Sequence, residues 1–137
     1  MNNYNISDPE FVNSELYQNF LNENPSVGYL KVRAYAAFGA VPISNLNVIV
    51  KKEINGNNVV FFEGATNSSG VIENISLPAP TSNTDDLVVP KSTTYVIEAT
   101  NLQDNIKERF NINIYEGLYS IQTINIVPKM MRDNNGS

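Results

Sequence analysis

Gly28-Tyr29-Leu30-Lys31-Val32-Arg33-Ala34-Tyr35 is the stretch that decides the fold class of this chain. Leu30, Val32 and Ala34 alternate with polar or aromatic residues, and a period of two places one set on a buried face of a β-strand. Further runs of β-forming residues occupy positions 46–54, 59–65, 71–77, 94–100, 106–114 and 119–127. Seven short strands predict an all-β fold, a seven-stranded antiparallel Greek-key sandwich.

Turn residues between these runs support the same fold. Asn55-Gly56 separates two of the runs, and both residues tolerate the positive φ that tight hairpin loops require, so we expect a β-hairpin there. The segment 78–90 is polar and bounded by prolines. It is long enough either to cross between the two sheets or to carry function.

The residues before Gly28 predict a helix instead of a strand. Ser7-Asp8-Pro9-Glu10 is typical of a helix start, and Asn24-Pro25 ends the pattern after Glu23. We therefore expect an acidic helical extension over residues 1–27, the sandwich over 28–128 and a disordered tail over 129–137. The apolar stripe of this helix consists of Phe11, Val12, Leu16, Phe20 and Leu21.

Composition excludes several classes of chemistry. The chain has 137 residues, enough for one core, and it contains no cysteine and no histidine. Disulfides, thiol nucleophiles, Cys/His zinc sites and Ser-His-Asp triads are therefore absent. We expect no metal and no cofactor.

Net charge and hydropathy limit the kinds of partner that the chain is expected to bind. The formal net charge is −5, which opposes binding to the phosphates of nucleic acids. Asp8, Glu10, Glu15 and Glu23 fall in residues 1–27, which contain no Lys or Arg. No apolar run is long enough to insert into a membrane, and Met1 is not followed by a basic signal-peptide region. We expect a protein that is cytoplasmic or assembled into a spore or envelope structure.

Several short motifs resemble a known family. Pro42-Ile43, Thr66-Asn67-Ser68-Ser69-Gly70 and Tyr95-Val96-Ile97-Glu98-Ala99 resemble the carboxypeptidase regulatory-like family, whose domains are transthyretin-like or Cna-B-like β-sandwiches. Over residues 24–128 the chain is more closely similar to the N-terminal pro-domain of clostridial spore cortex-lytic enzymes. Asn67 stands where the family has a turn aspartate, and no lytic domain follows Val127. The resemblance implies a spore-associated accessory module of a Firmicutes bacterium, without the enzyme's activity.

Lys31, Glu98 and Asn125 have the residue types and chain order of a Cna-B-type intramolecular isopeptide bond. That reaction needs a buried, neutral amine next to a buried carboxyl group. Each of the three residues is flanked by apolar neighbours, so alternation places all three on outer faces. We therefore expect no covalent link and only a solvated pairing of Lys31 with Glu98.

Exposed aromatic residues are the remaining candidates for binding. Tyr29 and Tyr35 share the outward face of the first predicted strand, and one of the adjacent Phe61 and Phe62 must point away from the core. We expect the N-terminal helix to cover the apolar outer face of one sheet. The alternative is that this face, or the helical stripe of Phe11, Leu16, Phe20 and Leu21, docks a protein partner or a second copy.

These residues together favour a non-catalytic interaction or structural module that acts by protein–protein docking. The alternative is a carbohydrate- or cell-wall-binding module, in which Tyr29 and Tyr35 stack on sugars. A small glycan hydrolase comes third, because carboxylates such as Glu63, Glu108 and Asp85-Asp86 form no motif.

Overall fold

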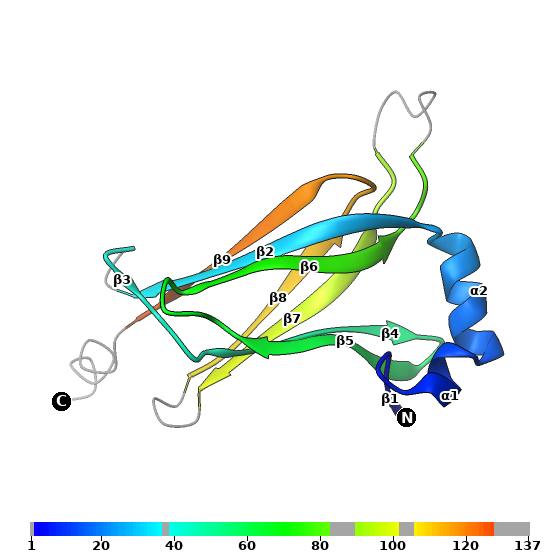
Figure 1. Ribbon diagram of the computed structural model, residues 1–137, viewed down its shortest axis with the longest axis horizontal. Coiled ribbons are helices and arrows are strands. Elements are labelled where there is room, and N and C mark those ends of the chain that lie inside the picture. Colours follow the sequence, from blue (N-terminus) through cyan, green and yellow to red (C-terminus); the bar gives the residue numbers. More distant parts are fainter. Residues whose placement is uncertain (1, 37–38, 83–89, 102–105, 128–137) are drawn as a thin grey trace.

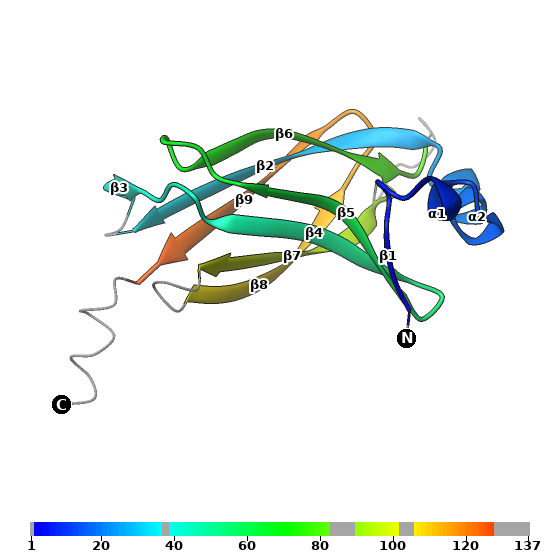
Figure 2. The same cartoon turned by 60° about the horizontal axis from the view of Figure 1, so that its bottom comes forward.

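The computed structural model describes residues 2–36, 39–82, 90–101 and 106–127, which form two β-sheets packed face to face (Figures 1 and 2). The five-stranded sheet has the order β1 (Asn3–Asn5), β5 (Asn57–Ala65), β4 (Asn47–Ile54), β7 (Thr93–Asn101) and β8 (Ile106–Ile114). The four-stranded sheet is built on β2 (Ser26–Ala36), which pairs with β3 (Val41–Pro42), β6 (Val71–Ala79) and β9 (Tyr119–Ile126). The predicted all-β sandwich is confirmed, and so is each of its seven strands.

Two features of the sheets differ from the prediction. The described residues form nine strands, because β1 and β3 are too short for any alternation to reveal them. The sheets are also mixed, because β1 pairs with β5 and β9 pairs with β2 in parallel. Most of the chain separates β2 from β9, so no hairpin turn fixes their relative direction.

The core lies between the sheets, where the alternation of β2 places it. Leu30, Val32 and Ala34 are fully buried. They face buried residues of β4 and β7, among them Val50 and Ile97, in one continuous apolar cluster.

The predicted hairpin is confirmed. β4 and β5 pair antiparallel up to Ile54 and Asn57, and the two residues between them have positive φ, 49° at Asn55 and 80° at Gly56. Such angles are those of a type I′ turn, whose twist matches that of the strands. In the predicted loop 78–90, Pro78 and Ala79 belong to β6, and residues 83–89 lie outside the described residues. The predicted disordered tail, 129–137, also lies outside them.

The single predicted helix is wrong, because two helices occupy its place. α1 (Pro9–Val12) begins where expected: Asp8 Oδ1 accepts a hydrogen bond from the Glu10 N–H at 3.0 Å. α2 (Glu15–Glu23) has its own N-cap, since Ser14 Oγ accepts from the Tyr17 N–H at 3.3 Å. Ser14 starts a second helix there because a serine hydroxyl competes for backbone N–H groups.

Both helices pack on the sandwich of their own chain, at one of its ends (Figure 1). Phe11, Tyr17 and Phe20 are buried, and the rings of Tyr17 and Phe20 lie 6.2 and 5.7 Å from that of Phe61. Aromatic rings at such distances in tilted arrangements stabilise one another beyond the area they bury. The helical stripe is therefore part of the main core. Neither described helix is long and apolar enough to cross a membrane.

Candidate functional site

The outer face of β2 and β9 brings together aromatic and aliphatic side chains, of which Tyr119 and Ile121 are exposed. The parallel register pairs Tyr29 with Tyr119 and Lys31 with Ile121, and residues paired in this way share a face. The surface is called the β2–β9 face below. Its members are Tyr29, Lys31, Arg33 and Tyr35 from β2, and Tyr119, Ile121, Thr123 and Asn125 from β9.

Ring contacts order this face. Tyr29 and Tyr119 stack with ring centroids 4.9 Å apart and an interplanar angle of 21°. The Arg33 guanidinium lies 5.4 Å from the centroid of the Tyr35 ring, within the range of a cation–π contact. Lys31 Nζ lies 3.6 Å from a carboxylate oxygen of Glu73. In a chain of net charge −5, the β2–β9 face itself carries only the cations Lys31 and Arg33.

Exposed apolar residues are concentrated along β9. Tyr119 is 61% and Ile121 53% exposed, high values for large side chains within a strand. Val27 lies next to the start of β9, because its carbonyl oxygen accepts a hydrogen bond from the Gly117 N–H, in the turn before β9, at 2.9 Å. Of the large hydrophobic residues exposed in the described part of the chain, one lies elsewhere, Val41, and five follow β9 or adjoin its start: Val27, Leu118, Tyr119, Ile121 and Val127. Exposed apolar side chains gathered along one strand are typical of an interaction site.

The expectation that the N-terminal helix covers this face is wrong. α1 and α2 lie at the end of the sandwich, and their buried rings contact Phe61 and not Tyr29 or Tyr35 (Figure 1). The end position follows from Phe61, whose ring reaches the core from β5 and receives Tyr17 and Phe20. The β2–β9 face is consequently free of contact with the helices.

Sequence reasoning found Tyr29 and Tyr35 and missed Tyr119 and Ile121. In β9 the apolar residues begin at odd positions, with Tyr119 and Ile121, and change to even positions, with Ile124 and Ile126. Only the second pair is buried. This change of phase within one strand was the available signal, because a strand cannot bury both faces against one core.

The other predicted binding residues belong mainly to the core. Phe61 is 5% exposed, and Phe62 does not turn outward as expected, because it pairs with the buried Val50 and packs against the core cluster. The register of β4 and β5 shifts between Val50 and Lys51, and such a bulge breaks the simple alternation of faces. The Phe62 ring covers Gly64, where an added Cβ atom would lie 2.7 Å from it. Phe11 and Phe20 are buried, and Leu16 and Leu21 are partly buried against the same cluster. A partner would have to detach the helices to reach this stripe.

The three isopeptide candidates are not brought together. Lys31 and Asn125 lie on the β2–β9 face, but Asn125 is four residues along β9 from Ile121, the partner of Lys31, or about 13 Å. Glu98 lies on β7 in the other sheet, where its carboxylate is 2.9 Å from Lys51 Nζ and 3.6 Å from Arg109. The expected solvated pairing of Lys31 with Glu98 is therefore wrong, because each residue pairs within its own sheet.

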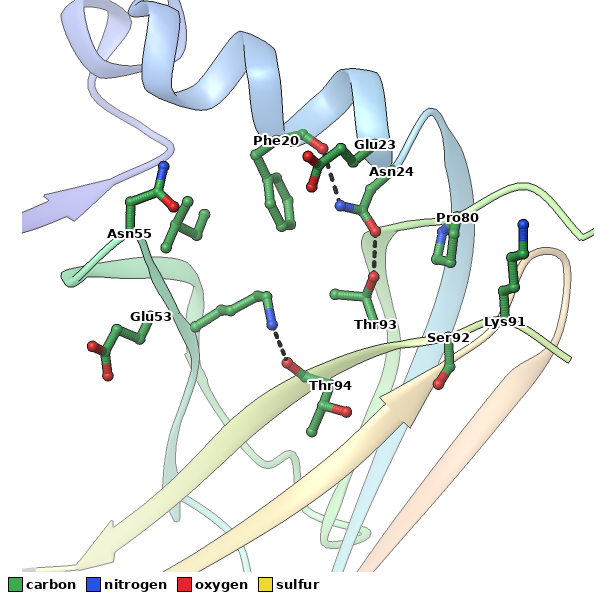
Figure 3. Close-up of a pocket in the computed structure, with 12 residues that line it drawn as sticks. Phe20, Glu23, Asn24, Glu53, Asn55, Pro80, Lys91, Ser92, Thr93 and Thr94 are labelled. Carbon is green, nitrogen blue, oxygen red and sulfur yellow. Dashed lines mark hydrogen bonds between the residues drawn. The ribbon is translucent and has the colours of Figure 1, made fainter. Parts of the chain in front are cut away.

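A pocket of about 630 Å³ opens between the end of α2, the β4–β5 turn and the start of β7 (Figure 3). Lys52 Nζ donates to the Thr94 carbonyl oxygen at 2.9 Å, and burial lowers the pKa of this amine. Asn24 Nδ2 donates to the Phe20 carbonyl oxygen at 3.0 Å, and Asn24 Oδ1 accepts from the Thr93 hydroxyl. The buried polar side chains of the pocket already have partners within the chain, so none of them is left unpaired for a ligand.

Acidic residues form no metal-binding cluster in the described part of the chain. No group of three or more His, Cys, Asp or Glu residues there is close enough to hold a metal ion. Glu73 pairs with Lys31, and Glu116 accepts from the Ser26 hydroxyl at 3.0 Å and the Ser82 N–H at 2.7 Å. Asp85 and Asp86 lie outside the described residues.

Comparison with known proteins identifies the fold. No protein-family model matches the chain, and no curated protein matches it. Among solved structures it is similar to 5-hydroxyisourate hydrolase from Klebsiella pneumoniae, with 13% identity and a TM-score of 0.50 over 74% of this chain and 90% of the other. It is also similar to (S)-allantoin synthase, with 12% identity and a TM-score of 0.47 over 82% of this chain.

The chain spans 44% of the length of the allantoin synthase, and at such identities a likeness shows the fold alone. The protein is thus a transthyretin-like β-sandwich. The comparisons do not support the narrower resemblance to the carboxypeptidase regulatory-like family or to spore enzymes.

Proposed function

We propose that this protein is a non-catalytic interaction module that docks a protein partner through the β2–β9 face. The observation that carries the proposal is the concentration of exposed apolar side chains along β9, with Tyr119 and Ile121 more than half exposed. Tyrosine and arginine are enriched where proteins bind one another, and Tyr29, Tyr119 and Arg33 lie together on this face. Association with a spore or envelope structure rests on the sequence resemblance.

The same geometry favours protein over carbohydrate. A sugar stacks on the open face of an aromatic ring, but the rings of Tyr29 and Tyr119 stack on each other, so one face of each ring is already covered. One face of Tyr35 is occupied by the guanidinium of Arg33. Saturable binding to purified peptidoglycan that is lost in a Tyr29→Ala variant would support the carbohydrate alternative and contradict docking of a protein.

A solved structure of similar fold is an enzyme, 5-hydroxyisourate hydrolase, so catalysis by this chain calls for a direct test. We expect the purified chain not to accelerate 5-hydroxyisourate hydrolysis, because it has no histidine and no cysteine to act as a general base or nucleophile. The decay of the substrate's ultraviolet absorbance measures this. A rate proportional to protein concentration would contradict the non-catalytic proposal.

Site-specific photo-cross-linking in cells of the source organism tests docking. A photoreactive phenylalanine analogue replaces Tyr119 in one variant and Val41 in the other, a position of similar exposure on β3, across β2 from β9. We expect a discrete adduct from position 119 that is absent from position 41 and is lost when Ile121→Lys is added. No adduct from position 119, or the same adducts from both positions, would contradict the proposal.

A further inference from the structure

One edge of β9 pairs with no strand among the described residues, and it lacks the features that normally prevent strands from pairing. Positions 118–127 contain no charged residue, no proline and no glycine, and within the described residues β9 pairs with β2 alone. The other edges have such features: β8 carries Lys107, Glu108 and Arg109, β6 carries Glu73 and Pro78, β3 contains Pro42, and β1 has only 3 residues. A long, uncharged edge with exposed apolar side chains is a template for adding another strand.

The side of the sandwich bordered by this edge is also open. β8 ends one sheet and β9 the other, and the turn between them joins the two edges. Phe110 and Ile112 of β8 face inward, because they pair with the buried Ile97 and Tyr95, yet both are only partly buried. The reason is that the five-stranded sheet has four long strands, whereas the other sheet has three, so β8 has no strand fully opposite it.

We infer that this open side binds a second copy of the chain, with the β9 strands of the two copies pairing antiparallel about a two-fold axis near Gln122. The inference rests on the proposed docking function and names its partner. In this register Ile121 lies opposite Thr123 and Tyr119 opposite Asn125 of the other copy. Ladder hydrogen bonds satisfy both edges, and the partly buried Phe110 and Ile112 of one copy approach those of the other.

Charge is the reason to choose a second copy as the occupant. Two chains of net charge −5 repel one another, so a surface without acidic residues is the one at which two copies meet with the least repulsion. A two-fold axis brings each residue close to its own counterpart, and the absence of charge in positions 118–127 removes like-charge contacts at the axis. Asp8, Glu10, Glu15 and Glu23 belong to the helical segment that covers an end of the sandwich (Figure 2).

Sedimentation velocity of the full chain tests this inference. We expect wild type to sediment with twice the mass of one chain, 15.2 kDa. Ile121→Lys places two cations near the axis and should weaken the association at least about tenfold. Val41→Lys is the matched control, because Val41 is 52% exposed and lies on β3; it should remain dimeric. At equal protein concentration Val41→Lys should keep the wild-type melting temperature, whereas Ile121→Lys should melt somewhat lower, because it loses the stabilisation that association adds. A cooperative thermal transition shows that Ile121→Lys is folded.

Cysteine cross-linking provides a second measurement that does not depend on the lysine variant. The chain has no cysteine, so Gln122→Cys introduces the only thiol, and oxidation should link two copies across the axis. Val41→Cys should stay unlinked. A wild type that is monomeric at its highest soluble concentration, or equal cross-linking of both variants, would overturn the inference.

The two proposals fail separately. If wild type is monomeric and the photoreactive residue at position 119 still forms an adduct with a different protein, the second copy is overturned and the docking proposal stands. A monomeric wild type without any Tyr119 adduct overturns both.

Discussion

Tyr95 and Pro78 join the two sheets of the sandwich by a hydrogen bond through the core. The Tyr95 hydroxyl, on β7 of the five-stranded sheet, donates to the Pro78 carbonyl oxygen, on β6 of the four-stranded sheet, at 2.5 Å. The Tyr95 ring is fully buried and meets the Phe61 ring edge-on, with centroids 5.1 Å apart. One side chain therefore fills the core and supplies a directional link between the layers.

Removing this hydroxyl should destabilise the protein while leaving the packing intact. Tyr95→Phe keeps the ring but leaves the Pro78 carbonyl oxygen without this donor, so we expect a loss of about 1–3 kcal/mol in the free energy of unfolding. Urea denaturation at neutral pH measures it. Tyr29→Phe, on the outer face, is the control and should change stability by less than about 0.5 kcal/mol. Equal stability of wild type and Tyr95→Phe would show that the hydrogen bond contributes nothing.

The same hydroxyl should make stability fall in alkali. Burial, with a smaller contribution from Tyr17, raises the pKa of Tyr95 far above its ordinary value of 10.0. Above about pH 10 the unfolded chain releases the Tyr95 proton and the folded chain retains it. Stability should then decrease with pH, by up to about 1.4 kcal/mol per pH unit for this tyrosine. Urea denaturation between about pH 8 and pH 11 should give a shallower alkaline decrease for Tyr95→Phe than for wild type. Parallel curves would contradict the assignment.

Local patterns predicted the elements that depend on neighbouring residues. The alternation at Leu30, Val32 and Ala34 identified the central strand, and Asn55-Gly56 identified a hairpin, because both signals arise within a few residues. The break at Ser14 was missed because residues 9–23 keep helical spacing on both sides of it. The pairing of β9 with β2 depends on the packing of the whole chain, which no local pattern encodes.

Only part of the candidate site could be predicted from the sequence, because strand pairing depends on the packing of the whole chain. Tyr29 was identified from its own strand, but its stacking partner Tyr119 lies ninety residues away and on a strand whose apolar phase changes. Their contact depends on the parallel register of β2 and β9. A single sequence places each residue on a face of its own strand and does not reveal which strands are neighbours.

The N-terminal helices should contribute a large part of the stability. Phe20 is 6% exposed and packs on Phe61, so Phe20→Ala leaves a cavity where α2 meets the sandwich. We expect a loss of about 3–5 kcal/mol, measured by urea denaturation. Asn19→Ala, on the exposed side of the same helix, should be nearly neutral. If Phe20→Ala were also neutral, the helices would not be anchored to the core.

Gly28 should not tolerate a side chain, because β2 passes very close to the end of β8. A Cβ atom at position 28 would lie 2.3 Å from the Tyr115 carbonyl oxygen and 2.6 Å from Ile114 Cγ2. Gly28→Ala must displace backbone, and we expect it to destabilise the protein by about 1–3 kcal/mol. Val27→Ala, at a position 45% exposed, is the neighbouring control and should have little effect. A wild-type melting temperature for Gly28→Ala would mean that the two strands separate easily.

Lys31, Glu98 and Asn125 should remain unlinked, because each has an environment that keeps it from reacting. Lys31 is near Glu73 and Glu98 is paired with Lys51 and Arg109, so the amine and the carboxylate have other partners and lie in different sheets. Isopeptide formation needs the amine neutral and next to the Asn125 amide, whose release as ammonia would lower the mass by about 17 Da. We expect intact-mass spectrometry of the denatured chain to give the full mass of the sequence. Lys31→Ala should then change the mass only by the difference between the two side chains. A deficit of about 17 Da in wild type that disappears in Lys31→Ala would contradict this prediction and show that the two strands are covalently joined.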